Sequence, residues 1–227
     1  MRHLAENIWV GRYPLSFLGG DQGRVVTVIR LASGELLIHS TAPFSPEDAE
    51  AIASLGRPGW IVDAMLRHDT YAKEGRAAFP TLPYLAPEGF AGGLGVGTQP
   101  LLPPPQAWSG EIEVMLVEGM PQAREHVFLH VPSRTLIVAD LLFNFDDAES
   151  RGWKGFVRRT LMGVRRHPDV ARTLPAQIKD RAAFERSLRR ILTWDFDRIV
   201  VGHGAVVETG GKEGFRTAFL AKGFLRS

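Results

Sequence analysis

The sequence predicts an α/β layered fold with two sheets. The chain has 227 residues, the length of one large domain or two small ones. Hydrophobic residues make up 44% and charged residues 23%, a balance that supports a sizeable core. Apolar segments typical of strands open each half of the chain, and segments typical of helices close it. This repeated order favours two sheets with helices packed on them.

The first half is expected to begin with strands and to hold two helices. Residues 32–35 form a typical hairpin turn between two apolar segments. Ser45 is a typical N-cap, Pro46 suits the first helical position, and Gly56 marks the end of the first helix. A second helix is expected after the fourth strand. The expected strands lie at 7–20, 24–31, 36–40, 59–66 and 83–86.

Residues 87–110 are rich in proline and glycine. The GGLGVG run at 92–97 is similar in composition to a phosphate-binding loop. However, no Lys-Ser or Lys-Thr pair follows it and no helix is expected after it. We therefore predict a surface loop rather than a nucleotide site. Long loops in compact domains often lie near a functional site, so the role of this loop stays open.

The second half repeats the pattern of strands followed by helices. Pro132 and Ser133 form the expected turn of a hairpin. A polar, arginine-rich helical stretch is expected over 148–190, with its arginines on solvated faces. A terminal helix is expected at 210–225. The expected strands lie at 111–119, 126–132, 135–145 and 194–204.

Charge and composition exclude several classes of partner. Lys and Arg total 27 against 25 Asp and Glu, a net charge of +2, which argues against nucleic acid and membrane surfaces. No window holds the roughly 18 apolar residues that span a bilayer, and the N-terminal segment lacks the apolar stretch of a secretory signal. There is no cysteine, which excludes disulfides and thiolate ligands. We therefore expect a cytoplasmic protein that binds a small molecule, and a homo-oligomer is compatible with the sequence.

Three histidines and one aspartate lie where predicted strands end. The histidines are His39, His68 and His203, and Asp140 ends the apolar run 136–139. Strand ends bring distant segments together, so imidazole and carboxylate groups there could share a cation. An aspartate beside so apolar a run is costly to bury unpaired and needs a metal ion, an arginine or several backbone donors.

The order of these segments resembles the metallo-β-lactamase superfamily over most of the chain. IVADLLF is similar to the strand that carries the family's bridging aspartate, at Asp140, and VVGHG to the strand that carries its final histidine, at His203. The resemblance implies a single domain over 1–227 with the four-layer αββα sandwich. It also implies one or two metal ions, commonly zinc or iron, at one edge of the sheets.

The family's His-x-His-x-Asp-His run is eroded, which indicates a divergent branch. Counting back from Phe79-Pro80 places His68 on the last histidine of the run. The earlier ligand positions then fall on Asp63, Met65 and Arg67. An alternative register makes His68 the first histidine and leaves Thr70, Ala72 and Lys73 at the other positions. The middle histidine, expected after residues 115–119, corresponds to Met120.

The remaining ligands suit one metal ion. Two imidazoles and a carboxylate, from His68, His203 and Asp140, can hold one zinc, iron or manganese ion and leave a position for water. Such an ion makes hydroxide available for hydrolysis. Asp69 is a candidate catalytic residue, as a fourth ligand or a proton carrier. The resulting hypothesis is a mononuclear metal-dependent hydrolase, and a di-iron oxidoreductase conflicts with the missing ligands.

A rival hypothesis is a metal-free, inactive remnant of the fold. Arg67 never loses its proton, and its guanidinium near Asp140 could take the electrostatic place of a metal ion. The same cleft would then bind a small ligand or a protein partner without chemistry. Phe143, Phe145 and Trp153 follow Asp140 and are expected in the core or as a wall of the cleft. The roles of Arg67 and of His39, which could simply bond a neighbouring loop, stay open.

Overall fold

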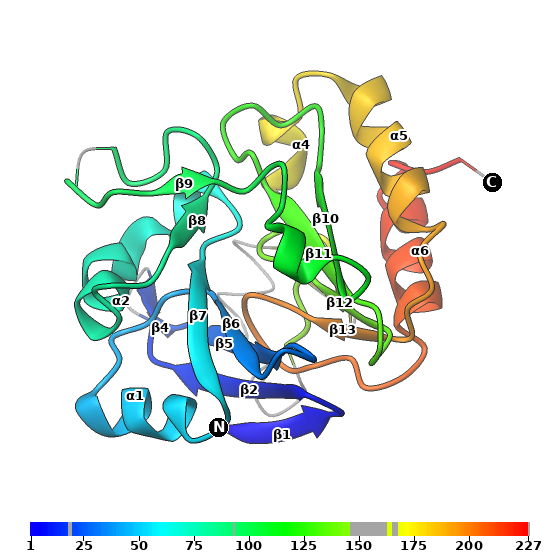
Figure 1. The fold of residues 1–227 in the computed structure, drawn as a ribbon. Coiled ribbons are helices and arrows are strands. Elements are labelled where there is room, and N and C mark those ends of the chain that lie inside the picture. The colour runs from blue at the N-terminus through cyan, green and yellow to red at the C-terminus, as the bar shows by residue number, and fades with distance from the viewer. Residues whose placement is uncertain (18–19, 93, 146–162, 165–167, 227) are drawn as a thin grey trace.

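The computed structural model describes residues 1–17, 20–92, 94–145, 163–164 and 168–226. Within these residues, two larger sheets lie side by side, with helices packed on their outer sides (Figure 1). The predicted α/β class and the αββα sandwich are therefore confirmed. None of the helices in the described part of the chain has the length and apolarity needed to cross a membrane.

The first sheet is built from the N-terminal half of the chain. Its β1–β2–β5–β6 neighbours pair antiparallel, and its β6–β7–β8–β9 neighbours pair parallel. The sheet therefore changes from antiparallel to parallel pairing at β6, with helices in the connections from β6 to β7 and from β7 to β8. In spatial order, its strands are β1 (Arg2–Ala5), β2 (Ile8–Tyr13), β5 (Arg24–Arg30), β6 (Glu35–His39), β7 (Arg57–Val62), β8 (Tyr84–Ala86) and β9 (Gln99–Pro100).

The second sheet comes from the C-terminal half. Its first three strands are antiparallel, and the last pair is parallel. In spatial order, its strands are β10 (Ile112–Leu116), β11 (His126–His130), β12 (Thr135–Ile137) and β13 (Arg198–Val200). A small hairpin, β3 (Ser16–Phe17) with β4 (Gly20–Asp21), follows β2.

Helices cover the outer faces of both sheets. The N-cap predicted at Ser45 is present: its side chain accepts a bond from the Asp48 N–H at 3.1 Å, and the Asp48 carboxylate accepts from the Ser45 N–H at 3.0 Å. Beside the first sheet lie α1 (Pro46–Ala53), the 3₁₀ turn η1 (Leu66–Tyr71) and α2 (Ala72–Ala78). With the second sheet lie η2 (Gln106–Trp108), α4 (Leu174–Gln177), α5 (Arg181–Ile191) and α6 (Gly211–Ala221).

The alternation of side chains along β5 divides the core. Val25 and Ile29 belong to the large apolar cluster that includes both sheets and the helices α5 and α6. Val26 and Val28 point the other way, into a smaller cluster with residues of α1 and α2. Such a strand is apolar on both faces because both faces are covered.

Several strands are shorter than the apolar runs predicted. The run 135–145 forms a strand only over Thr135–Ile137, and the run 194–204 only over Arg198–Val200. In each case the chain leaves the sheet before the residue with candidate chemistry. The expected loop over 87–110 contains β9 and η2, and its Trp108 is fully buried, so part of it belongs to the fold.

The helical stretch predicted over 148–190 lies partly outside the described residues, and Trp153 lies wholly outside them. In the described part of that stretch, Asp180 caps α5 by accepting a bond from the Ala183 N–H at 2.9 Å. Among the described residues before it, 163–164 and 168–179, the one helix is the four-residue α4, so the expected helical stretch is interrupted there. Pro168 and Pro175 interrupt this segment and disfavour one uninterrupted helix.

Candidate metal centre

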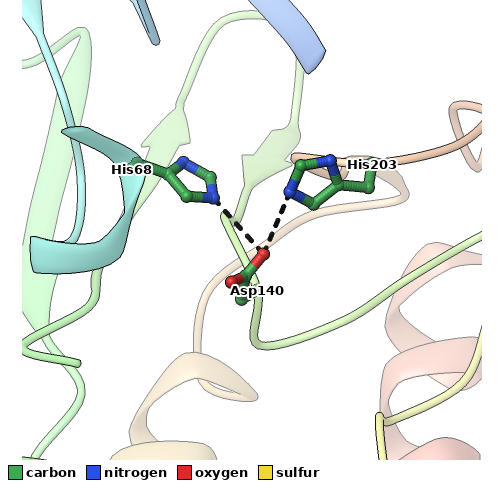
Figure 2. A group of neighbouring side chains, drawn as sticks. All are labelled: His68, Asp140 and His203. Atoms are coloured by element: carbon green, nitrogen blue, oxygen red, sulfur yellow. Dashed lines mark hydrogen bonds and ion pairs between the residues drawn. The ribbon is translucent and has the colours of Figure 1, made fainter. Parts of the chain in front are cut away.

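One group of three side chains with metal-binding atoms lies together in the described part of the chain: His68, Asp140 and His203 (Figure 2). Asp140 Oδ1 is 3.3 Å from His68 Nε2 and 3.2 Å from His203 Nε2. His68 comes from the first half of the chain and the other two from the second. The centre therefore forms only when the two sheets pack together.

His68 lies in the 3₁₀ turn that follows β7. Its φ and ψ of −96° and 22° depart from helical values, and its side chain is only 2% exposed. Burial, and then the positive charge of Arg24, lower the pKa of His68 to about 4, although the negative charge of Asp140 opposes them. The ring is therefore neutral at physiological pH and can offer a nitrogen lone pair to a metal ion.

Asp140 lies three residues beyond the end of β12. Burial alone would raise the pKa of its carboxyl group, but the imidazoles of His68 and His203 hold that pKa well below its usual range. Its side chain is 29% exposed, far more than the histidines. The carboxylate therefore lies on the side of the centre that water and a ligand can reach.

A second carboxylate, Glu125, binds the backbone of the Asp140 turn. It is 1% exposed, and its two oxygens accept N–H bonds from Ala139 at 2.8 Å, Asp140 at 3.2 Å and Leu141 at 3.1 Å. Burial, and then the negative charge of Asp140, raise the pKa of Glu125 to about 8, against the opposing effect of the three N–H groups. A glutamate in the polar run Gln122–Glu125 gave no sign of this role in the sequence.

His203 follows β13 in a turn held against the start of β5. Its Nδ1 lies 2.6 Å from the Gly23 carbonyl oxygen, and the Val25 N–H donates to the Gly202 carbonyl at 2.9 Å. Because a carbonyl only accepts, Nδ1 carries the hydrogen. In the neutral ring, Nε2 then has a free lone pair that faces the Asp140 carboxylate.

The glycines on either side of His203 allow the backbone of neighbouring turns to approach closely. A Cβ on Gly202 would lie 2.8 Å from the Ala139 carbonyl oxygen and 3.0 Å from His68 Cε1. Gly204 has a φ of +106°, and a Cβ there would lie 2.2 Å from the Asn144 carbonyl oxygen. The Gly-His-Gly sequence thus lets the His68 ring and two neighbouring turns approach the His203 backbone closely.

The ring of Phe143 packs against the ring of His203. The Phe143 and His203 rings are stacked, with centroids 5.8 Å apart and an interplanar angle of 12°. Phe145 stacks in turn on Phe143, and both phenylalanines are buried. The expectation that they line the site holds for Phe143, whereas Phe145 is its support in the core.

Asp63, Met65 and Met120, at the positions where the family's ligands are missing, make contacts within the fold instead. Asp63 is fully buried and accepts hydrogen bonds from the Thr41 hydroxyl at 2.7 Å and the Tyr84 hydroxyl at 2.5 Å. Its other oxygen lies 3.9 Å from Nη1 of Arg24, which is itself 1% exposed. Met65 and Met120 are buried in the apolar core. Sequence reasoning missed Arg24, a charge hidden at the start of an apolar strand.

Arg67, Asp69 and His39 lie outside the group of three. The Arg67 side chain is exposed, and among the described residues it makes no ion pair with Asp140. Asp69 is partly buried and does not join the three ligand atoms, so its role stays a prediction. His39 is buried with its ring edge against Phe128, with centroids 4.9 Å apart.

The three side chains fit one metal ion. Ligand atoms about 2.1 Å from a tetrahedral zinc ion are about 3.4 Å apart, close to the separations around Asp140 Oδ1. Two nitrogens and one oxygen are typical ligands of zinc, and iron and manganese also accept them. A metal ion between Asp140 Oδ1 and His203 Nε2 would take the place of the proton through which these two atoms otherwise bond.

No protein-family model and no curated protein sequence matches the chain. Solved structures of metallo-β-lactamases are similar over nearly its whole length. The enzyme FIM-1 from Pseudomonas aeruginosa, in its mono-zinc form, is 11% identical, with a TM-score of 0.66 over 98% of this chain and 94% of that one. A metallo-β-lactamase from Erythrobacter litoralis is 16% identical, with a TM-score of 0.65 over 98% and 95%.

A third neighbour, the metallo-β-lactamase from Pontibacter korlensis, is 12% identical, with a TM-score of 0.61 over 97% of each chain. The chain therefore has the metallo-β-lactamase fold, as the sequence resemblance predicted. At these low identities the likeness establishes the fold alone, and the chemistry must be argued from the residues of this chain.

Proposed function

We propose that the protein is a hydrolase that uses one divalent metal ion held by His68, Asp140 and His203. The observation that carries the proposal is the contact between His203 Nε2 and Asp140 Oδ1, which are 3.2 Å apart. The other ring nitrogen of His203, Nδ1, donates its hydrogen to the Gly23 carbonyl. A neutral imidazole oriented in this way is arranged as a metal ligand. The mono-zinc form of FIM-1, a structural neighbour, supports zinc as the first metal to test, before iron and manganese.

The chain's own residues divide the chemistry among them. A bound metal ion supplies a water molecule whose pKa falls to about 7. His203, oriented by Gly23, and His68, kept neutral by burial, each present Nε2 to the centre. Asp140 has a low pKa, so it serves as a ligand and is a poor base. Asp69 remains our candidate for carrying the proton away.

The metal-free alternative is less favoured. It required a guanidinium beside Asp140, and Arg67 is exposed and unpaired with that carboxylate. The buried arginine near the centre, Arg24, lies beside Asp63 instead. Among the described residues, no lysine or arginine side chain forms an ion pair with Asp140.

Hydrolysis assays with metal removal test this proposal. Esters, lactones, phosphoesters and β-lactams are offered to the protein before and after chelation and after re-addition of zinc, iron or manganese. We expect at least one class to be hydrolysed, with activity lost on chelation and in His203→Ala. The control His3→Ala changes an exposed histidine outside the group and should keep the activity. Hydrolysis by His203→Ala at the parent rate would contradict the proposal.

A further inference from the structure

The carboxylate of Glu125 is a buried group that the hydrolytic mechanism does not use. Three successive backbone N–H groups, from Ala139 to Leu141, converge on it. Without this side chain, three buried backbone donors would lack the partners they have in the fold, which is costly. The turn that carries Asp140 is therefore held by one side chain from the segment just before β11.

The same short segment also binds the turn that precedes His68. The Leu66 N–H donates to the Ala123 carbonyl at 2.9 Å, and the His126 N–H donates to the Ala64 carbonyl at 2.7 Å. Residues 123–126 thus contact both ligand-bearing turns, one through their backbone and the other through the Glu125 side chain. The Asp140 turn needs such a contact because it lies beyond the end of β12.

We propose that Glu125 is a positioning residue for the metal centre and acts on the metal through Asp140. This inference rests on the proposed function. Glu125 has its oxygens on the backbone of the turn and does not belong to the group of ligand atoms. A displacement of the 139–141 backbone would move Asp140 Oδ1 away from both imidazoles. Loss of such supporting groups typically weakens metal affinity about 10–100-fold.

The substitution Glu125→Gln tests the role because glutamine has the same shape and a different pattern of donors. One of its two terminal atoms is an NH₂ group, which would face a backbone N–H instead of accepting from it. We expect zinc affinity, measured by competition with a chromophoric chelator, to fall about 10–100-fold. We also expect the absorption spectrum of the Co²⁺-substituted protein to change, because Asp140 is displaced.

The matched control is Glu111→Gln. Glu111 also holds a backbone N–H, that of Ala32 at 2.9 Å, in a turn at the opposite end of β5 from Gly23. This variant should bind zinc as the parent does and keep the Co²⁺ spectrum. If Glu125→Gln loses stability but keeps both the zinc affinity and the Co²⁺ spectrum, the residue is merely structural and the inference is overturned.

Two further outcomes are separable. If Glu125→Gln does not fold, Glu125→Asp keeps the carboxyl group but shortens its reach by one methylene, and parental zinc affinity in that variant would overturn the inference. A parent protein that binds no zinc, cobalt, iron or manganese overturns the proposed function and this inference with it. If the parent binds zinc and Glu125→Gln binds it equally tightly, the inference is overturned but the proposed function is not.

Discussion

At the scale of single residues, His203 is held from two sides before any ligand binds. The Gly23 carbonyl fixes its Nδ1, and the Phe143 ring stacks on its face. The glycines on either side of it permit the close approach of the Ala139 and Asn144 carbonyls. A histidine restrained in this way loses little conformational freedom when it binds a metal ion.

Asp140 and His203 could be predicted from the sequence motifs that contain them. His68 could be predicted only as the one histidine left of an eroded motif. Asp140 and His203 end apolar runs, a pattern visible in the sequence. The groups that orient them were not visible: Gly23 acts through its carbonyl, and Glu125 lies in a polar stretch typical of a solvated loop. A backbone acceptor leaves no trace in residue type, so only the structure identifies it.

The buried His39 predicts a dependence of stability on pH. Burial, and then the charges of His68 and Arg24, lower the pKa of His39 from 6.5 to about 3. Below about pH 6.5, His39 becomes protonated in the unfolded chain but stays neutral in the folded chain. The free energy of unfolding therefore falls as the pH falls towards 3. His39→Gln cannot titrate. Its free energy of urea unfolding should fall less than the parent's between about pH 7 and about pH 4.5. Equal losses in both proteins would contradict this account.

At the scale of elements, the apolar runs predicted the strands but not where they end. The run from Thr135 leaves the sheet after Ile137, where backbone N–H groups turn to the Glu125 carboxylate instead of a neighbouring strand. Periodicity cannot show that change of partner, because the residues that follow are still apolar. The ends of the strands are thus set by the same contacts that position the centre.

The ends of four segments of the first sheet meet at Asp63. Arg24 starts β5, Thr41 follows β6, Asp63 follows β7, and Tyr84 starts β8. Burial raises the pKa of Asp63, whereas Arg24 and the two hydroxyls oppose that rise. This cluster joins the strand ends beside the candidate centre.

Asp63→Asn should strongly destabilise the fold because it leaves the Arg24 guanidinium buried without a counter-charge. Breaking a buried pair in this way typically costs about 3–5 kcal/mol. Urea unfolding of the metal-free protein measures the loss. The control Asp195→Asn removes an exposed pair with Arg134, 2.7 Å apart, and should change stability little. A similarly small change in Asp63→Asn would refute the role of this pair.

At the scale of the whole molecule, the fold class and its resemblance to metallo-β-lactamases were predictable from the order of segments. The grouping of His68, Asp140 and His203 was also expected, but the contacts that bring them together were not visible, because they depend on how the two sheets pack. His68 reaches Asp140 and His203 only across that interface, and the His203 turn binds β5 of the other sheet. Residues 72 positions apart in the sequence then share one contact. The candidate centre thus joins the two halves of the sandwich.

The most direct test of the account is the metal content of protein purified without a histidine tag. Elemental mass spectrometry is applied to the parent and to His203→Ala, each after incubation with zinc, manganese or iron and removal of excess metal. We predict about one metal ion per chain in the parent, as the three ligands require, and a loss of that ion in the variant. No bound metal in the parent, or equal metal in both proteins, would contradict the central claim.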